Sequence, residues 1–187
     1  MTLRSAVRCR PMSIDLRLGT PQAWEYMVGG EPQTWWRVPV HNRKDPVDVT
    51  VRVTGIEPEV RLIVPDCRLH RMGDDPPDEK YAGETRLKHN EQAWFDVITM
   101  SPKAPGHQAV VVSSSSGQFD VTWSGGKRWP LPVEFCFRTV DRPYYRMPVE
   151  LDGSYRITLT AHFGSKSVSK TYALQAVPGR QILSISE

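Results

Sequence analysis

The feature that most constrains this chain is an alternation of apolar and polar residues between Trp35 and Thr54. Because successive side chains of a strand point to opposite faces, such a pattern predicts two strands that each bury one face. Their short polar connection predicts a β-hairpin, with Trp36 in the core and only Trp35 free for a functional role. The apolar positions lie on both sides of a Pro-containing turn at residues 43–46: Trp36, Val38, Val40, Val47, Val49, Val51 and Val53.

Similar alternation recurs along the rest of the chain. It predicts strands over residues 14–18, 59–64, 93–100, 133–138 and 181–185, short strands at 109–112 and 119–123, and a second hairpin over 155–174. About ten short strands separated by turn residues are typical of all-β domains. We therefore predict an antiparallel β-sandwich rather than a closed barrel, whose strands would be more evenly spaced.

Two stretches depart from the strand pattern. Thr20-Pro21 is typical of a helix start, so residues 22–27 are predicted to form one short helical turn, the only helical element expected. Residues 66–92 lose periodicity and are rich in charged residues and proline. They predict a long middle loop, either functional or disordered.

The length of 187 residues suits one elaborated domain, which we assign to residues 12–187. Residues 1–11 are expected to be a disordered tail, with translation starting at either Met1 or Met12. Three arginines and no acid in this tail account for the whole formal net charge of +3, so charge gives no reason to expect nucleic acid as a partner. No apolar run approaches the ~20 residues of a membrane span, and no secretory signal is evident, which favours a cytoplasmic protein.

Two segments resemble a known family. Residues 34–55 contain Val-Pro-Val-His-Asn before a polar turn and a Val-x-Val-x-Val strand, and residues 150–176 contain Gly-Ser-Tyr-Arg-Ile-Thr-Leu-Thr-Ala leading to Ser-Lys-Thr-Tyr-Ala-Leu. Together they resemble the early and final strands of bacterial immunoglobulin-like domains. The resemblance implies an immunoglobulin-like sandwich whose final hairpin brings the chain back through the core. That family shares no active site, so the resemblance implies no functional residue.

Potential metal ligands are few and scattered. Three cysteines at irregular spacing are predicted to be reduced thiols rather than a disulfide framework. Cys67 and His70 have the spacing of two zinc ligands but no further pair nearby, and the acidic run at residues 74–79 lacks the glycine of a calcium loop. We therefore predict neither a metal site nor a cofactor.

Catalytic motifs are equally sparse. The chain has no Gly-x-Ser-x-Gly motif and no glycine-rich phosphate loop. Cys136 lies between two phenylalanines, which indicates a packed, inert thiol. Histidines near carboxylates at strand ends leave a small hydrolase or nuclease as an alternative function, with His41 near Asp45 and Asp48, or His162, as the base.

Basic and aromatic residues concentrate between Gly125 and Arg146. Arg, Trp and Tyr dominate protein interfaces because they combine a large contact area with a polar group. The leading hypothesis is a non-enzymatic β-sandwich module that binds another protein through a predicted patch: Lys127, Arg128, Trp129, Arg142, Tyr144, Tyr145 and Arg146. The same residue types suit single-stranded nucleic acid, a less favoured partner. A lectin-like sandwich, with Trp129 or Trp35 stacked on a sugar ring, is the second alternative.

Overall fold

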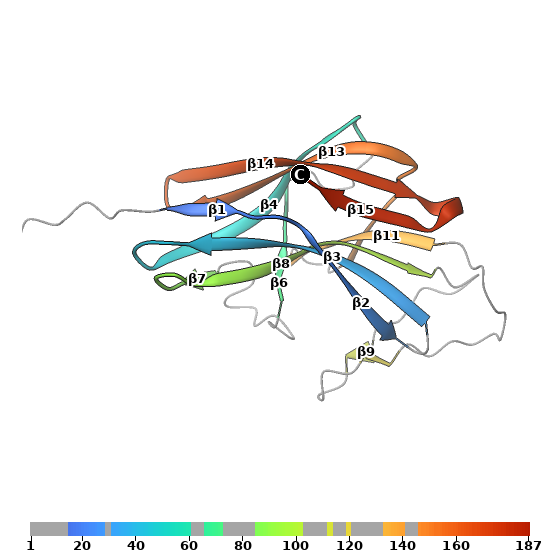
Figure 1. Ribbon diagram of the computed structural model, residues 1–187, viewed down its shortest axis with the longest axis horizontal. Helices are drawn as coiled ribbons and strands as arrows, with labels where there is room; N and C mark the ends of the chain where they lie inside the picture. Colours follow the sequence, from blue (N-terminus) through green and yellow to red (C-terminus); the bar gives the residue numbers. More distant parts are fainter. Residues whose placement is uncertain are drawn as a thin grey trace, which may run out of the picture.

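The computed structural model of the chain describes residues 15–28, 31–60, 66–72, 85–102, 112–113, 119–120, 133–140 and 146–187. These residues form an all-β fold in which two antiparallel sheets lie in two layers (Figure 1). The described part has a 3-10 helix, η1 (Pro178–Arg180), and no α-helix. Accordingly, none of its helices is long and apolar enough to cross a membrane.

The first sheet is organised around the long strand β3 (Glu31–Asn42). Its strand order is β1 (Leu16–Leu18), β3, β8 (Gln92–Pro102), β11 (Val133–Arg138) and β12 (Arg146–Val149). In addition, β2 (Gln22–Val28) pairs with β3, and β6 (His70–Arg71) pairs with β8. The register of β3 against β8 shifts between Trp36 and Arg37.

The second sheet contains the C-terminal strands. Its order is β15 (Ile182–Ser186), β14 (Lys166–Val177), β13 (Gly153–Phe163), β4 (Val47–Glu57) and β5 (Cys67–Arg68), and β7 (Thr85–Leu87) pairs with β4. A separate pair consists of β9 (Val112–Ser113) and β10 (Phe119–Asp120). The predicted all-β fold with two antiparallel sheets is thus confirmed.

The hydrophobic core lies between the two sheets. Each fully buried apolar side chain contributes about 1.5 to 3 kcal/mol relative to an exposed one, so the alternating positions determine how the sheets pack. Trp36 also links the two sheets, because its indole Nε1 donates a hydrogen bond to the carbonyl oxygen of Leu183 over 2.9 Å. The largest core side chains come from both layers: Tyr172, Phe95, Phe137, Leu69, Leu87, Ile98, Met147, Ile157, Leu159 and Leu174.

The hairpin predicted between Trp35 and Thr54 is wrong in its pairing. β3 and β4 lie in opposite sheets, so these consecutive strands face each other across the core. The predicted buried faces are correct, since Val38 and Val40 of β3 and the valines of β4 all lie in the core. Alternation specifies which face of a strand is buried, and the same face is buried whichever strand lies beside it.

The helical turn predicted at residues 22–27 is also wrong. These residues belong to β2, in which Trp24 lies opposite Trp35 and Tyr26 lies opposite Gln33. A helix-start signal is a weak local preference, whereas pairing with a long strand provides a ladder of hydrogen bonds and aromatic cross-strand contacts. Tertiary pairing therefore overrides the local signal.

Residues 66–92 contain more regular structure than the predicted long loop. β5 and β6 lie near its start and β7 near its end, and the chain passes from the second sheet at β5 to the first sheet at β6. The unpredicted β12 is equally short. These four strands have two to four residues each, and no apolar alternation in the sequence around them marked their positions. The predicted strand at 59–64 is not formed at residues 59–60, and its remainder lies outside the described residues.

The remaining strand predictions agree with the structure. β13 and β14 form the second hairpin, with Gly153 opposite Ala176 at one end and Phe163 opposite Lys166 at the other. β1, β8, β11 and β15 lie within or across the predicted ranges at 14–18, 93–100, 133–138 and 181–185. β10 falls within the range at 119–123, whereas β9 overlaps the range at 109–112 only at Val112. The predicted tail at residues 1–11 lies outside the described residues.

Candidate functional site

A buried ion pair lies on the face of the first sheet that points away from the core. Arg37 of β3 and Asp96 of β8 are cross-strand neighbours, and Arg37 Nε donates a hydrogen bond to Asp96 Oδ1 over 2.5 Å. Arg37 Nη1 donates a second one to the hydroxyl of Tyr26 in β2. Only 4% of Arg37 and 3% of Asp96 are exposed, so the outer face of this sheet is covered at this point.

His70 of β6 is the second hydrogen-bond partner of the Asp96 carboxylate. Its Nδ1 lies 3.3 Å from Asp96 Oδ2. Burial disfavours the charged carboxylate, but the hydrogen bond from His70 and the charge and hydrogen bond of Arg37 outweigh burial and lower the pKa of Asp96. An ionised carboxylate only accepts hydrogen bonds, so the proton of the His70–Asp96 contact belongs to Nδ1.

Aromatic rings surround the Arg37 guanidinium. Its Cζ lies 5.0 Å from the ring centroid of Trp24, 5.2 Å from that of Tyr26 and 5.6 Å from that of Trp35. These distances are within cation–π range. Trp35 also has the guanidinium carbon of Arg138 4.6 Å from its centroid. The residue predicted to be free for function is thus engaged by two arginines.

This Arg37 network, formed by Arg37, Asp96, His70, Tyr26, Trp24 and Trp35, is suited to holding strands together. Burial lowers the pKa of Arg37, but the charge of Asp96 and the hydrogen bonds to Asp96 and Tyr26 outweigh burial and raise it above the ordinary value. The guanidinium is therefore charged at any pH at which proteins fold. Its partners come from β2, β3, β6 and β8, so the network joins four strands of the first sheet.

The sequence did not predict that the residues of the Arg37 network come together. Arg37 lies between Trp36 and Val38, and Asp96 lies between Phe95 and Val97. A charged residue of each sign inside an apolar run is the signal that would have singled out this pair. The pairing itself depends on the register of strands 59 residues apart, which the sequence pattern does not fix.

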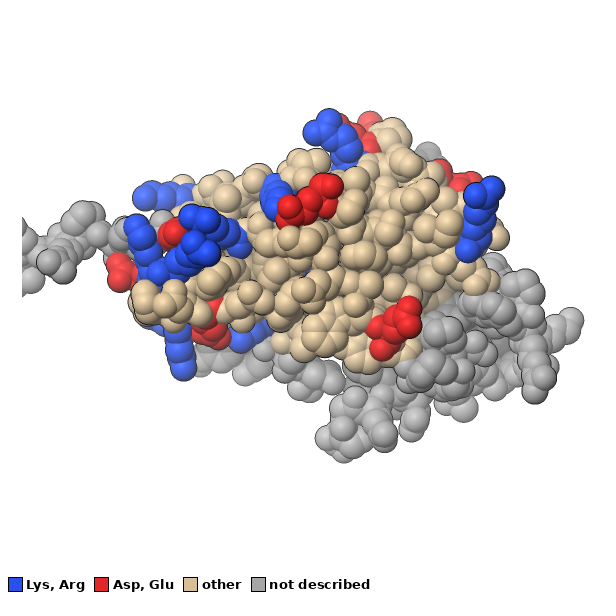
Figure 2. Space-filling view, in the orientation of Figure 1, with Lys and Arg blue, Asp and Glu red and all other residues tan. Residues whose placement is uncertain are grey.

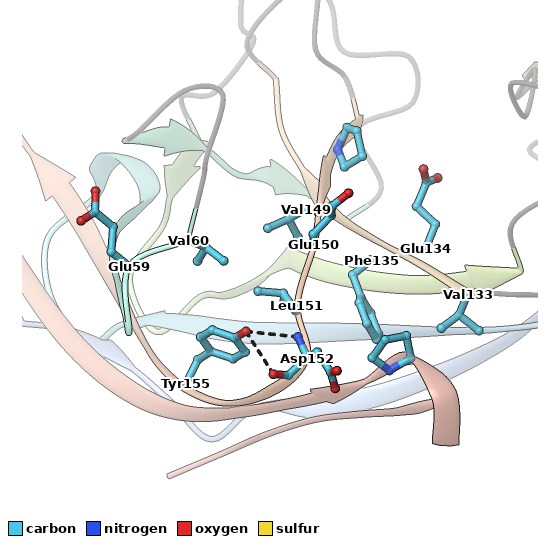
Figure 3. A pocket seen from close by; sticks show the side chains of 12 residues that line it. Glu59, Val60, Val133, Glu134, Phe135, Val149, Glu150, Leu151, Asp152 and Tyr155 are labelled. Carbon is cyan, nitrogen blue, oxygen red and sulfur yellow. Dashed lines mark hydrogen bonds between the residues drawn. The ribbon is translucent and has the colours of Figure 1, made fainter.

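A groove at one end of the sandwich is a site that a partner could enter (Figure 3). Its volume is about 890 Å³, and both sheets contribute to it through β11, β12, β13 and η1, with two residues that follow β4. Figure 3 shows the apolar side chains of Val60, Leu151 and Tyr155 facing the interior of the groove. The full lining consists of Glu59, Val60, Val133, Glu134, Phe135, Pro148, Val149, Glu150, Leu151, Asp152, Tyr155 and Pro178.

Tyr155 connects the floor of the groove to its rim. Its hydroxyl oxygen accepts a hydrogen bond from the backbone N–H of Asp152 over 3.1 Å. The same hydroxyl donates to the Asp152 carbonyl oxygen over 3.4 Å. These contacts orient the ring of Tyr155 beside Leu151, which is buried, while the Asp152 side chain stays exposed.

The predicted patch lies mostly outside the described residues. Residues 127–129, 142, 144 and 145 are all in this category. Arg146 is the first residue of β12 and so belongs to a strand. The acidic run at residues 74–79 is likewise outside the described residues.

The predicted metal and catalytic residues occupy separate places. Cys67 packs in the core, whereas His70 contacts Asp96 on the outer face. In the part of the chain that the structure describes, no group of three or more His, Cys, Asp or Glu residues is arranged to hold a metal ion. Cys136 is 1% exposed, as predicted for a packed thiol.

The predicted histidine bases are not part of the groove lining. His41 lines a different cavity, of about 350 Å³, with Pro39 and Trp94. Asp48 lies 3.4 Å from Arg86, and the carbonyl oxygen of Asp45 accepts a hydrogen bond from Asn42. His162 is half-buried, and its Nε2 has no hydrogen-bond partner in the described part of the chain.

Comparison with known proteins adds no relative from which to transfer a role. No protein-family model, curated protein or solved structure matches this chain, so any function must be argued from its own residues.

Proposed function

We propose that this chain is a non-enzymatic, immunoglobulin-like β-sandwich module that binds another protein at the groove. The groove carries this proposal, because it combines a volume of about 890 Å³ with an apolar floor and access from solvent. Apolar surface that a partner removes from water is the main source of affinity in protein interfaces. Two antiparallel sheets packed over one core support the immunoglobulin-like part of the proposal.

The predicted patch is adjacent to the groove in sequence. Residues 127–129 precede β11 and residues 142–145 precede β12, and both strands contribute to the groove lining. Most of the patch lies outside the described residues, so it stays a separate prediction and the groove alone carries the proposed function.

The alternative functions gain less support from the described residues. A hydrolase that uses a histidine base needs that histidine and a carboxylate in one accessible site. The described lining of the groove contains no histidine, and the described lining of the cavity at His41 contains no carboxylate. A sugar ring on Trp35 would compete with Arg37 and Arg138 for its faces. Neither alternative has an observation that favours it over protein binding.

Site-specific photo-crosslinking in the native cells tests this function. A photoreactive phenylalanine analogue is placed at Val60 or Glu150 in the groove and, as a control, at Lys166. Lys166 begins β14 and Val177 ends it next to η1, so the control lies about 40 Å away along the strand. We expect a discrete cross-linked protein from the groove positions alone. Equal cross-linking from Lys166, or none from the groove, would contradict the proposal.

A further inference from the structure

The groove has a charge pattern that indicates what kind of protein segment it accepts. Four carboxylates belong to its lining, from Glu59, Glu134, Glu150 and Asp152. No lysine or arginine is among the described lining residues; Arg156 and Arg180 are neighbours in sequence of lining residues but do not line the groove. The described part of the rim is therefore acidic, and the floor is apolar.

The four carboxylates are spread around the groove rather than gathered at one point. In Figure 3 the carboxylates of Glu59 and Glu134 lie on opposite sides, and that of Asp152 lies apart from both. Among the described residues they form no group that could hold a metal ion. A ligand that matches them needs several positive charges at separate positions, which a small molecule with one cation does not provide.

An extended peptide satisfies the rim and the floor together. Successive side chains of an extended chain point to opposite sides, so alternate residues can enter the apolar floor while the others stay near the rim. Val60 and Tyr155 are half-buried and present apolar surface to such a chain. Aliphatic residues suit the floor, and lysine or arginine suits the rim.

Addition of the partner segment as a further strand at the edge of the first sheet explains its recognition less well than contacts with the groove side chains do. β12 is the terminal strand of that sheet's main path and borders the groove through Pro148 and Val149. Pro148 has no backbone N–H, so this edge offers an interrupted set of hydrogen-bond donors. Contacts with side chains must therefore supply most of the specificity.

The two turns at the opposite end of the sandwich carry more basic than acidic side chains, because Arg43, Lys44 and Lys166 outnumber Asp45. Figure 2 shows Lys and Arg side chains gathered where the turn between β3 and β4 and the turn between β13 and β14 lie. Arg43, Lys44 and Lys166 are exposed in or beside these turns. A basic partner is repelled from that end and attracted to the groove, which favours one binding orientation.

From these observations we infer that the groove binds an extended protein segment in which lysine or arginine alternates with aliphatic residues. The inference rests on the proposed function and names the chemistry of its partner. The floor supplies most of the affinity, and the exposed charge pairs supply selectivity and salt dependence.

Fluorescence anisotropy with labelled ten-residue peptides tests this inference on the full chain. The probe alternates lysine and valine; one control peptide replaces lysine with glutamate, and another has the same composition in two blocks. The groove variant is Glu59→Gln/Glu150→Gln/Asp152→Asn. Its matched control, Glu25→Gln/Asp45→Asn/Asp48→Asn, changes the net charge by the same amount at exposed positions outside the groove lining.

We expect the alternating lysine peptide to bind wild-type protein, the glutamate peptide not to bind, and the block peptide to bind more weakly. The groove variant should lose about tenfold in affinity, because each exposed charge pair contributes a factor of about 1.5 to 5, and the control variant should bind as wild type. Raising the salt concentration should reduce the difference in peptide affinity between the two variants.

Any of three results would overturn the inference. The two variants could bind the peptide equally, or the lysine and glutamate peptides could bind equally. The third is a concentration-dependent self-association of the protein that the peptide does not displace. If the peptide experiment fails but a groove-specific cross-link forms in cells, only the claim that the partner segment is basic is overturned, and the proposed function stands. Failure of both experiments overturns both.

Discussion

Arg37 and Asp96 place opposite charges on an outward sheet face that is nevertheless buried. Removing each ion from water costs several kcal/mol, and a buried pair is favourable only when its geometry and its remaining hydrogen bonds are good. Here Asp96 receives hydrogen bonds from Arg37 and His70, and Arg37 also donates to Tyr26. Removing one partner would leave the other charged, buried and without compensation.

Asp96→Asn is therefore expected to lower the free energy of unfolding by about 3 to 5 kcal/mol, because Arg37 stays charged in a site that is 4% exposed. The matched control is Asp48→Asn, which breaks the exposed pair with Arg86 and should cost about 0 to 1 kcal/mol. Urea denaturation of both variants measures the difference. Similar losses in the two variants would show that the Arg37 network does not depend on its buried charge.

Acid provides an independent check on the same residue. The pKa of Asp96 is lowered in the folded protein, so its contribution to stability is complete above the ordinary carboxyl pKa of about 3.9 and is lost as pH falls through that value toward the folded pKa. Wild-type protein should consequently lose stability more steeply than Asp96→Asn below about pH 4. If the curves of unfolding free energy against pH, measured by urea denaturation, are parallel for the two proteins, the lowered pKa of Asp96 is contradicted.

At the scale of strands, the sequence predicts buried faces better than it predicts neighbours. The valines of β4 are correctly assigned to the core, but their strand pairs with β13 instead of β3. Burial acts on each strand separately, whereas pairing depends on residues far apart in the chain. The groove escapes prediction for the same reason, since Glu59, Phe135 and Tyr155 come together only when the ends of several strands meet.

The junction between β1 and β2 offers a test at this scale. Gly19 donates a backbone hydrogen bond to the carbonyl oxygen of Pro39 over 2.9 Å, and a Cβ at Gly19 would lie 2.9 Å from Pro39 Cγ. A proline ring cannot rotate away, so the strands must shift. Gly19→Ala should cost about 1 to 3 kcal/mol of stability in thermal or urea unfolding.

Gly179→Ala in η1 is the control for that substitution. A Cβ at this position meets nothing within 4 Å, so the change in unfolding free energy should stay within about 0.5 kcal/mol. An equally small effect at Gly19 would mean that the junction of β1 and β2 adjusts without cost.

At the scale of the whole molecule, a tyrosine ties the two layers together. Tyr172 of β14 is 1% exposed in the core, and its hydroxyl donates a hydrogen bond to the carbonyl oxygen of Gly19 over 2.9 Å. The bond joins the second sheet to the edge of the first. Burial, with a smaller contribution from the charge of Glu187, raises the pKa of Tyr172 well above its ordinary value.

This raised pKa predicts how the stability of the sandwich changes at alkaline pH. The unfolded chain ionises tyrosine near pH 10, while folded Tyr172 keeps its proton, so the free energy of unfolding falls as pH rises above that value by up to about 1.4 kcal/mol per pH unit. Tyr172→Phe should be less stable at pH 8, by about 0.5 to 1.5 kcal/mol for the lost hydrogen bond to Gly19. The variant has no such proton to lose, so its deficit in unfolding free energy relative to wild type should shrink between pH 8 and pH 11 in urea unfolding. Every other tyrosine is present in both proteins and serves as an internal control. A constant deficit would show that Tyr172 ionises as readily in the folded protein as in the unfolded chain.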